Sequence, residues 1–239
     1  MFVELDRRAY ESSNFNNSDS SIEIIESISP SKEFIIISHG FAGSKEMMRQ
    51  IAYDIANAGS NAVLFDFIGH GSNQQKLVNQ PAEITGTTQQ LVAQLSDIIK
   101  SIYEKFGNEI SISLVGHSMA SDIVIRASAD ERIKSVVAIS PYSTGITPDF
   151  PKDLLLISGQ FENHLRSHAL KMVKTFRPDA EENTGYADER IRRKASYIKN
   201  TGHVSVIYAP QTTKIIICLL YTSDAADEGL GVDLGGRRI

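Results

Sequence analysis

Short apolar runs alternate with segments of helical periodicity over most of the 239 residues. The run "EFIIISHG" (33–40), bounded by glycine, is typical of a strand that is buried on both faces. "SKEMMRQIAYDIANAG" (44–59) places Met47, Ile51 and Ile55 at helical spacing. The same criteria predict further strands over 21–28, 61–67, 109–116, 133–140, 153–159 and 194–200, and further helices over 82–106, 119–128, 164–176 and from 204 onward.

Strands that alternate with helices predict βαβ units and an α/β domain with a mostly parallel sheet. The strands before residue 38 are expected to form an antiparallel edge. Residues 11–21 are polar and turn-rich, so they are expected to form an exposed loop or a hairpin tip. The segment 177–194 is predicted to be irregular. Only residues 141–152 separate two of the strands, so a minimal cap or none is expected.

The composition supports one domain, which we expect to span residues 1–217 with residues 1–21 partly flexible. The net charge of −5 comes from 24 basic and 29 acidic residues that are interspersed, which argues against a nucleic-acid partner. No apolar run approaches the ~18–20 residues of a membrane span. The N-terminus "MFVELDRRAY" lacks the apolar core of a signal peptide, so a cytoplasmic protein is expected.

The last 22 residues, "CLLYTSDAADEGLGVDLGGRRI", show neither helical nor strand periodicity. Two blocks in them, "CLLYTSDAADE" and "VDLGGRRI", resemble the in-frame translation of a sequencing adapter. We therefore expect residues 218–239 to be a non-native, disordered tail and the final helix to be truncated at residue 217. Because Cys218 is the only cysteine, disulfide and thiol chemistry are not expected.

The segment "GHSMA" (116–120) follows a predicted strand and precedes a predicted helix. Strand, G-x-S-x-small turn and helix together are the context of a nucleophile elbow, so Ser118 is the candidate nucleophile. Gly116, His117 and Ala120 are its supporting neighbours. Ala120 stands where the motif has a second glycine, and its single methyl group weakens the pattern without forbidding the turn.

The loop "SHGFAGSKE" follows another predicted strand and contains His39, Gly40 and Phe41. An HG-x-x-G loop at this place supplies a backbone N–H for an oxyanion hole. The amides of Phe41 and Met119 are therefore the candidate donors.

A third compact turn, "DFIGHGSN" (66–73), holds Asp66 and His70 after a strand. This pair permits a metal or acid–base interpretation. We favour a structural one, in which both residues brace the loop next to the oxyanion strand, and no metal site is predicted.

Two later strand ends supply a carboxylate and an imidazole. Glu162 follows the strand 153–159, and His203 follows the strand 194–200. The chain order Ser118, Glu162, His203 is the Ser, Asp/Glu, His order of a hydrolase triad, in which histidine takes the serine proton and the carboxylate orients the imidazole.

Other residues of the same types compete for these roles. His164 and His168 lie on a predicted amphipathic helix and are interpreted as surface or packing residues. The rival acids are Asp149, Asp153 and the acidic residues of 179–189, and Glu162 is preferred to all of them.

Over roughly residues 22–217, the chain resembles the α/β-hydrolase superfamily, and in particular its serine esterase, lipase-like and dienelactone-hydrolase-like members. The resemblance rests on "HGFAGS", "FDFIGHG", "GHSMAS", "ISGQFE" and "TGH". It implies a mostly parallel sheet of about eight strands flanked by helices, and hydrolysis through an acyl-enzyme with no cofactor. Dienelactone hydrolases have cysteine at the elbow, whereas this chain has Ser118.

Three functions fit this pattern. The preferred one is cleavage of a small-molecule carboxylic ester by the triad. Cleavage of an amide or peptide with the same triad is the second. The third is a non-catalytic binding domain that retains the fold, which the presence of all three triad residues disfavours.

Overall fold

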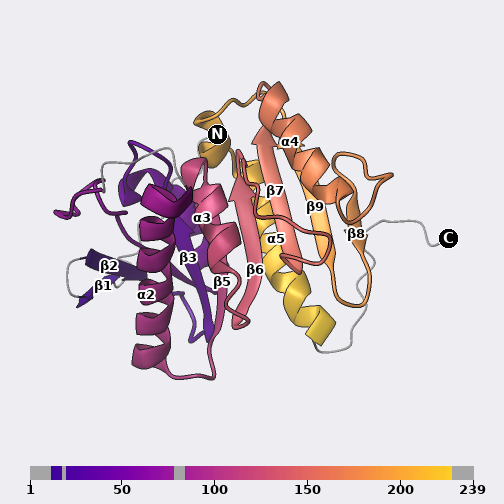
Figure 1. Cartoon of the computed structure of the whole chain (residues 1–239). Helices are drawn as coiled ribbons and strands as arrows, with labels where there is room; N and C mark the ends of the chain where they lie inside the picture. The colour runs from indigo at the N-terminus through magenta and orange to yellow at the C-terminus, as the bar shows by residue number, and fades with distance from the viewer. Residues whose placement is uncertain (1–11, 18–19, 78–83, 228–239) are drawn as a thin grey trace, which may run out of the picture.

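The computed structural model describes residues 12–17, 20–77 and 84–227, which form one sheet between two layers of helices (Figure 1). The nine strands of this described part are β1 (Ser12–Asn17), β2 (Ser20–Ile25), β3 (Glu33–Ser38), β4 (Asn61–Leu64), β5 (Ser111–His117), β6 (Ile133–Ile139), β7 (Asp153–Gly159), β8 (Gly185–Ala187) and β9 (Arg192–Ile198). The helices are α1 (Arg49–Asn57), α2 (Gln89–Phe106), α3 (Met119–Ala127), α4 (Asn163–Lys174) and α5 (Pro210–Asp227), with shorter helical turns η1 (Lys45–Met48), η2 (Ile84–Thr88) and η3 (Ser205–Tyr208).

The strand order across the sheet is β1-β2-β4-β3-β5-β6-β7-β9-β8. All pairings from β4 to β9 are parallel, whereas β1, β2 and β8 are attached antiparallel at the two edges. The prediction of a mostly parallel α/β sheet is confirmed. The antiparallel edge at the N-terminus is made by β1 and β2 alone, because β3 pairs parallel with β4 and β5.

Two strands lie in segments that the sequence predicted to be loops. β1 occupies most of the polar segment 11–21 and pairs with β2 along its whole length. β8 lies within the segment 177–194 and pairs with β9. Both are held by backbone hydrogen bonds to a neighbouring strand, and neither carries the apolar alternation on which the prediction depended.

The final helix is longer than predicted. α5 continues through Ile217 to Asp227, whereas a disordered tail was expected from residue 218 onward. The truncation of the native helix at residue 217 stays a prediction. Ile216 and Leu220 are both buried in the core beneath this helix. They lie one helical turn apart on the same face, and this packing continues the helix past the expected end. Residues 228–239 lie outside the described part, and the resemblance to an adapter sequence stays a prediction.

The sheet has a hydrophobic core on each face. Ile36 and Leu114 face one core, which α2, α3 and α4 cover. Ile35 and Val115 face the other, which α1 and α5 cover. Burial on both faces explains why these strands read as continuous apolar runs. Within the described ranges, no helix is both long enough and apolar enough to cross a membrane.

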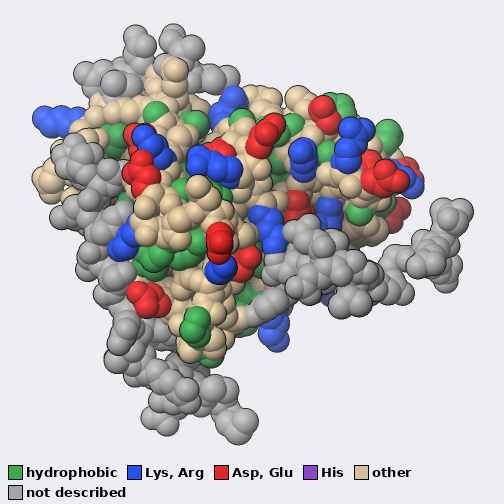
Figure 2. Space-filling view, turned by 90° about the horizontal axis from the view of Figure 1, so that it is seen from below, with side chains coloured by type: hydrophobic (Ala, Val, Ile, Leu, Met, Phe, Trp, Pro, Cys, Tyr) green, Lys and Arg blue, Asp and Glu red, His purple; other side chains and the backbone are tan. Residues whose placement is uncertain are grey.

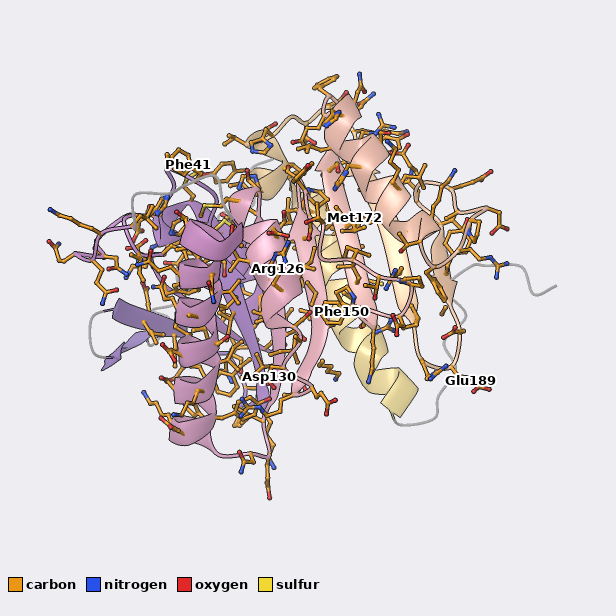
Figure 3. All side chains as sticks on the ribbon, viewed as in Figure 1. Phe41, Arg126, Asp130, Phe150, Met172 and Glu189 are labelled. Carbon is orange, nitrogen blue, oxygen red and sulfur yellow. The ribbon has the colours of Figure 1, made fainter. Side chains whose placement is uncertain are left out.

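The carboxyl ends of the parallel strands lie at one edge of the molecule. Figure 3 places Phe41, in the loop after β3, at the upper end, and Asp130, between α3 and β6, toward the lower end. The loops that follow β3, β5, β6, β7 and β9 therefore gather at the upper edge, where sites of open parallel sheets form.

Candidate active site

Ser118 occupies a sharp turn between β5 and α3. Its backbone has φ 55° and ψ −117°, a conformation that a residue with a side chain rarely adopts. Two backbone hydrogen bonds hold the turn: the Ser118 N–H donates to Ile139 O at 2.8 Å, and Ser118 O accepts from Ser121 N at 2.9 Å. The sequence GHSMA thus folds as a strand, a strained turn and a helix, which is the backbone arrangement that the motif predicted.

The small residues Gly116 and Ala120 of this turn differ in how strictly the structure requires them. A Cβ atom at Gly116 would lie 2.5 Å from the carbonyl oxygen of Ala120, so a side chain at position 116 does not fit. Ala120 is fully buried, and its methyl group belongs to the core beneath α3. The turn therefore requires glycine at 116, and it accommodates alanine at 120.

The side chains of Ser118, His203 and Glu162 form one hydrogen-bonded chain. His203 Nε2 lies 2.8 Å from Ser118 Oγ, and His203 Nδ1 lies 2.6 Å from Glu162 Oε1. The Glu162 side chain is only 6% exposed, whereas that of His203 is 46% exposed. The carboxylate is thus enclosed, while the imidazole and the serine face the solvent at the upper edge.

Glu162 is held by two further donors on its second oxygen. The Gly159 N–H donates to Oε2 at 2.5 Å, and the hydroxyl of Ser140 donates to the same atom at 2.8 Å. Ser140 is buried and has φ 50°, again in the left-handed region. The sequence analysis did not identify Ser140, although its place at the carboxyl end of β6 was a signal that could have found it.

The rival acids lie elsewhere. Asp153 forms an ion pair with Arg192 at 2.5 Å, and Asp149 accepts a hydrogen bond from Thr147. In the segment 179–189, Glu182 pairs with Arg166. Glu162 is the carboxylate that contacts His203.

The loop that carries His203 passes very close to the end of β7. A Cβ atom at Gly159 would lie 2.7 Å from Thr201 O and 2.9 Å from Gly202 O. The Phe161 N–H donates to Thr201 O at 3.0 Å and ties the two loops together. The absence of a side chain at Gly159 therefore permits the approach that brings His203 onto Glu162.

His117, the residue before Ser118, contacts the histidine loop from the other side. Its Nε2–H donates to the backbone oxygen of His203 at 2.8 Å, and the two rings lie 5.0 Å apart. Burial lowers the pKa of His117, which favours the neutral ring. Its Nδ1 is buried and has no hydrogen-bond partner among the described residues, as suits an unprotonated nitrogen.

The loop after β3 lies directly against the serine. A Cβ atom at Gly40 would be 3.0 Å from the Cβ of Ser118. The loop turns tightly, since Gly43 N donates to Gly40 O and Ala42 has φ 56°. Across the described ranges, neither the Phe41 nor the Met119 amide N–H has an acceptor. Both donors remain available for a ligand next to Ser118.

His39 supports this loop from inside. Its Nδ1–H donates to Gly40 O at 2.8 Å, and its Nε2 accepts from the Phe67 N–H at 3.1 Å. These two bonds define one neutral tautomer. Burial lowers the pKa of His39, in agreement with that neutral form.

Asp66 and His70 organise the neighbouring turn. Asp66 accepts hydrogen bonds from the Lys45 N–H at 2.7 Å and from the N–H and hydroxyl of Ser72 at 2.9 and 2.8 Å. Burial raises the pKa of Asp66, but these donors outweigh it and the net effect lowers that pKa. His70 donates from Nδ1 to Ile68 O. In the residues that the structure describes, no group of three His, Cys, Asp or Glu side chains is placed to hold a metal ion.

The other two histidines are on α4. His168 is half-buried, with its Nε2 3.1 Å from Ser143 O and its ring stacked on Tyr142. His164 is exposed. Neither contacts the Ser118, His203 and Glu162 chain among the described interactions.

Known structures share this fold at low sequence identity. An esterase of Pyrococcus furiosus, Pf2001, superimposes with a TM-score of 0.68 at 15% identity, covering 90% of this chain and 92% of that one. MenH of S. aureus gives 0.62 at 12% identity, covering 85% and 98%. A dienelactone hydrolase of Anabaena variabilis gives 0.59 at 14% identity, covering 90% and 95%.

A search of curated proteins finds no match to this sequence. The sequence profile of a hydrolase family, described as serine aminopeptidase, S33, matches residues 29–215, which is most of the chain. Together with the sheet order and the structural likeness, this match identifies the fold and the family. The chain belongs to the serine aminopeptidase S33 hydrolase family of the α/β-hydrolase superfamily.

Proposed function

We propose that this chain is a serine hydrolase that cleaves carboxylic esters through a covalent acyl-enzyme. The observation that carries this role is the hydrogen-bonded chain from Ser118 Oγ through His203 to Glu162, with distances of 2.8 and 2.6 Å. Serine is a weak nucleophile at its own pKa, and a histidine within hydrogen-bond reach is the group that activates it.

In the first half of the reaction, Ser118 Oγ attacks the ester carbonyl carbon while His203 Nε2 takes the hydroxyl proton. The carbonyl π bond opens, and the negative charge collects on the former carbonyl oxygen. The amides of Phe41 and Met119, which have no acceptor in the described part of the chain, hydrogen-bond this oxyanion. Glu162 stabilises the imidazolium that forms.

The tetrahedral intermediate then collapses, and His203 gives its proton to the departing alcohol. A water molecule enters, His203 removes its proton, and the resulting attack releases the carboxylic acid and restores the Ser118 hydroxyl. Both half-reactions use the same two amides and the same proton carrier.

An amide or peptide substrate is the second candidate, because the family is described as serine aminopeptidase. An aminopeptidase must pair the α-ammonium group of its substrate with an anion or with hydrogen-bond acceptors. The carboxylates on α3 and on the loop before α4 are both engaged: Asp122 by Arg126 and Ser143, Glu162 by His203 and its two further donors. This engagement favours an ester over a free amino terminus.

A fluorophosphonate probe tests whether Ser118 is the nucleophile. We expect the probe to label the wild type and the Ser96→Ala variant, which changes an exposed serine on α2, and to leave Ser118→Ala unlabelled. His203→Ala should slow labelling by several orders of magnitude. Equal labelling of the wild type and Ser118→Ala would contradict the proposal, and a complete lack of labelling would favour a non-catalytic binding domain.

A matched pair of chromogenic substrates separates the two hydrolase candidates. The 4-nitrophenyl ester and the 4-nitroanilide of the same acyl group differ only in the bond that is cleaved. We expect measurable kcat/KM for the ester in the wild type and its loss in Ser118→Ala. Faster cleavage of an aminoacyl anilide than of any ester in the series would favour the peptidase.

A further inference from the structure

Most of the exposed large hydrophobic side chains lie at the edge of the sheet that carries Ser118. The described part of the chain exposes seven such side chains, and five of them lie in the loops and the short helix η3 at the upper edge. We call these five the apolar rim: Phe41, Tyr142, Phe161, Val204 and Tyr208. Phe41 and Phe161 are 73% and 68% exposed.

Three rim residues are direct neighbours of site residues. Phe161 precedes Glu162, and Val204 follows His203. Phe41 follows Gly40, the residue that lies against Ser118. The apolar rim is therefore connected to three sides of the site: to Glu162, to His203 and to the loop after β3.

The remaining two members extend the rim. Tyr142 lies two residues after Ser140, which binds Glu162, and its ring stacks on His168 at 4.5 Å and 15°. Tyr208 ends the short helix η3 that follows His203. Stacking holds the Tyr142 ring against α4 and leaves 54% of the residue exposed.

The opposite end of the molecule differs. Figure 2 looks at this lower end and shows basic and acidic side chains interspersed with apolar ones. The two other exposed large hydrophobics, Ile28 and Phe106, line a hollow at the amino ends of the strands. Five of the seven exposed large hydrophobic side chains thus lie at the edge that carries Ser118, and two lie at the opposite end. Contiguous exposed apolar surface marks a place where a partner or ligand binds.

The position of Ser118 decides which ligand fits the rim. A protein bound on the rim would cover the serine and exclude any substrate. A substrate that is itself an extended apolar surface would bring its ester groups to Ser118 while it contacts the rim. The 46% exposure of the His203 side chain shows that this edge is open.

We propose that the apolar rim binds the surface of an aggregated lipid ester, such as a micelle or bilayer of long-chain acyl esters. This inference rests on the proposed ester hydrolysis and specifies its substrate class. Each rim side chain that enters the acyl region is removed from water, which gives adsorption without any requirement for opposite charge.

Sedimentation with vesicles of a zwitterionic diether phosphatidylcholine, whose chains carry no carboxylic ester bond, tests adsorption without turnover. We expect the wild type to sediment with the vesicles, and Phe161→Ser to lower the partition coefficient about tenfold. The matched control is Ile28→Ser, which removes a side chain of similar exposure, 62%, from the opposite end. Equal loss in both variants, or a wild type that stays in the supernatant, would overturn the proposal.

Hydrolysis measured in parallel distinguishes this proposal from the one on which it rests. With a medium-chain ester, we expect the wild-type and Ile28→Ser rates to rise when the substrate passes its critical micelle concentration, and that rise to be reduced in Phe161→Ser. Turnover of monomeric esters without vesicle adsorption would overturn the proposal that the rim binds a lipid surface, and would still support ester hydrolysis. Adsorption without turnover of any ester would contradict the proposed ester hydrolysis, and the lipid ester would then no longer be supported as the ligand of the rim. If the wild type self-associates and Phe161→Ser abolishes that association, the rim is an interface between two copies of this chain instead.

Discussion

His117 Nε2 donates a hydrogen bond to the backbone oxygen of His203 across 2.8 Å. His117, which directly precedes Ser118, therefore holds the loop that carries His203. The His203 imidazole is thereby fixed from both ends: its backbone by His117, and its ring by Glu162 at 2.6 Å. Catalytic groups need to be held within a fraction of an ångström of their productive positions. His117 is therefore a positioning residue in the proposed mechanism.

The first prediction concerns this bond. His117→Phe keeps a ring at the position and removes the donor to His203 O. We expect kcat for ester hydrolysis to fall about fivefold, which corresponds to the loss of a hydrogen bond worth about 1 kcal/mol, while KM changes little. Steady-state kinetics on a soluble ester measures both constants.

The control for this prediction is His164→Phe, which changes an exposed histidine on α4. It should leave kcat and the rate of fluorophosphonate labelling unchanged. If His117→Phe lowers only the melting temperature, at constant kcat and labelling rate, the residue is structural and has no positioning role.

The second prediction concerns the support of Glu162. Ser140→Ala removes the hydroxyl that donates to Glu162 Oε2 at 2.8 Å and leaves only the Gly159 N–H on that oxygen. We expect kcat to fall about tenfold because the carboxylate loses a donor that fixes its orientation. Stopped-flow or steady-state rates with a soluble ester provide the measurement.

Two companion variants separate orientation from folding. Ser140→Gly also lacks the hydroxyl but adopts φ 50° without strain, so it should lose the same activity while being the more stable of the two. Ser158→Ala removes a buried hydroxyl of β7 that has no partner in the described part of the chain, and should preserve activity. A fully active Ser140→Gly would show that the hydroxyl is dispensable.

Sequence patterns predicted much of this arrangement because strand ends constrain it. The apolar runs located β3, β5, β7 and β9, and the carboxyl-end rule predicted that the loops after them meet. The structure places Ser118 Oγ and Glu162 Oε1 each within hydrogen-bond distance of the His203 ring. Polar β1 and three-residue β8 were not predicted, since backbone pairing with a neighbouring strand, and not an apolar pattern of their own, holds them in the sheet.

Residue pairs that depend on exact loop paths could not be derived from sequence. The contact between His117 and His203 O joins positions that are 86 residues apart, and it exists because Gly159 lets the second loop pass close to β7. The continuation of α5 past Ile217 was likewise missed, since the burial of Leu220 depends on the core beneath it. In each case the information lies in the tertiary neighbour.

The third prediction concerns the two small residues of the elbow. Gly116→Ala places a methyl group 2.5 Å from Ala120 O, so α3 must shift away from β5. We expect the Ser118 hydroxyl to move with it, and kcat/KM to fall at least 100-fold. Ala120→Gly only removes a buried methyl group, so it should keep kcat and lose about 1 kcal/mol of the free energy of unfolding. Urea unfolding and ester kinetics on the two variants measure both effects, and an active Gly116→Ala would refute the close approach.

The last prediction concerns the dependence of stability on pH. Burial lowers the pKa of both His39 and His117 from 6.5. Below pH 6.5 the unfolded chain therefore binds more protons at these residues than the folded chain does. The contribution of these two histidines to the free energy of unfolding therefore falls as the pH decreases below 6.5, by at most about 1.4 kcal/mol per pH unit for each. Well above pH 6.5 both histidines are neutral in the folded chain and in the unfolded chain, so no stability is lost at these two positions.

Urea unfolding at pH 7.5 and 5.5 tests this sign, and His117→Phe isolates one of the two histidines. Buried Asp153 acts in the opposite direction, because burial raises its pKa above 3.8, but that contribution is common to both proteins. The lowered pKa of Asp66 acts only below 3.8, outside this range. We expect the wild type to lose more stability than His117→Phe between the two pH values. An equal or smaller loss in the wild type would mean that His117 carries a proton in the folded state, and it would then be a cation beside His203.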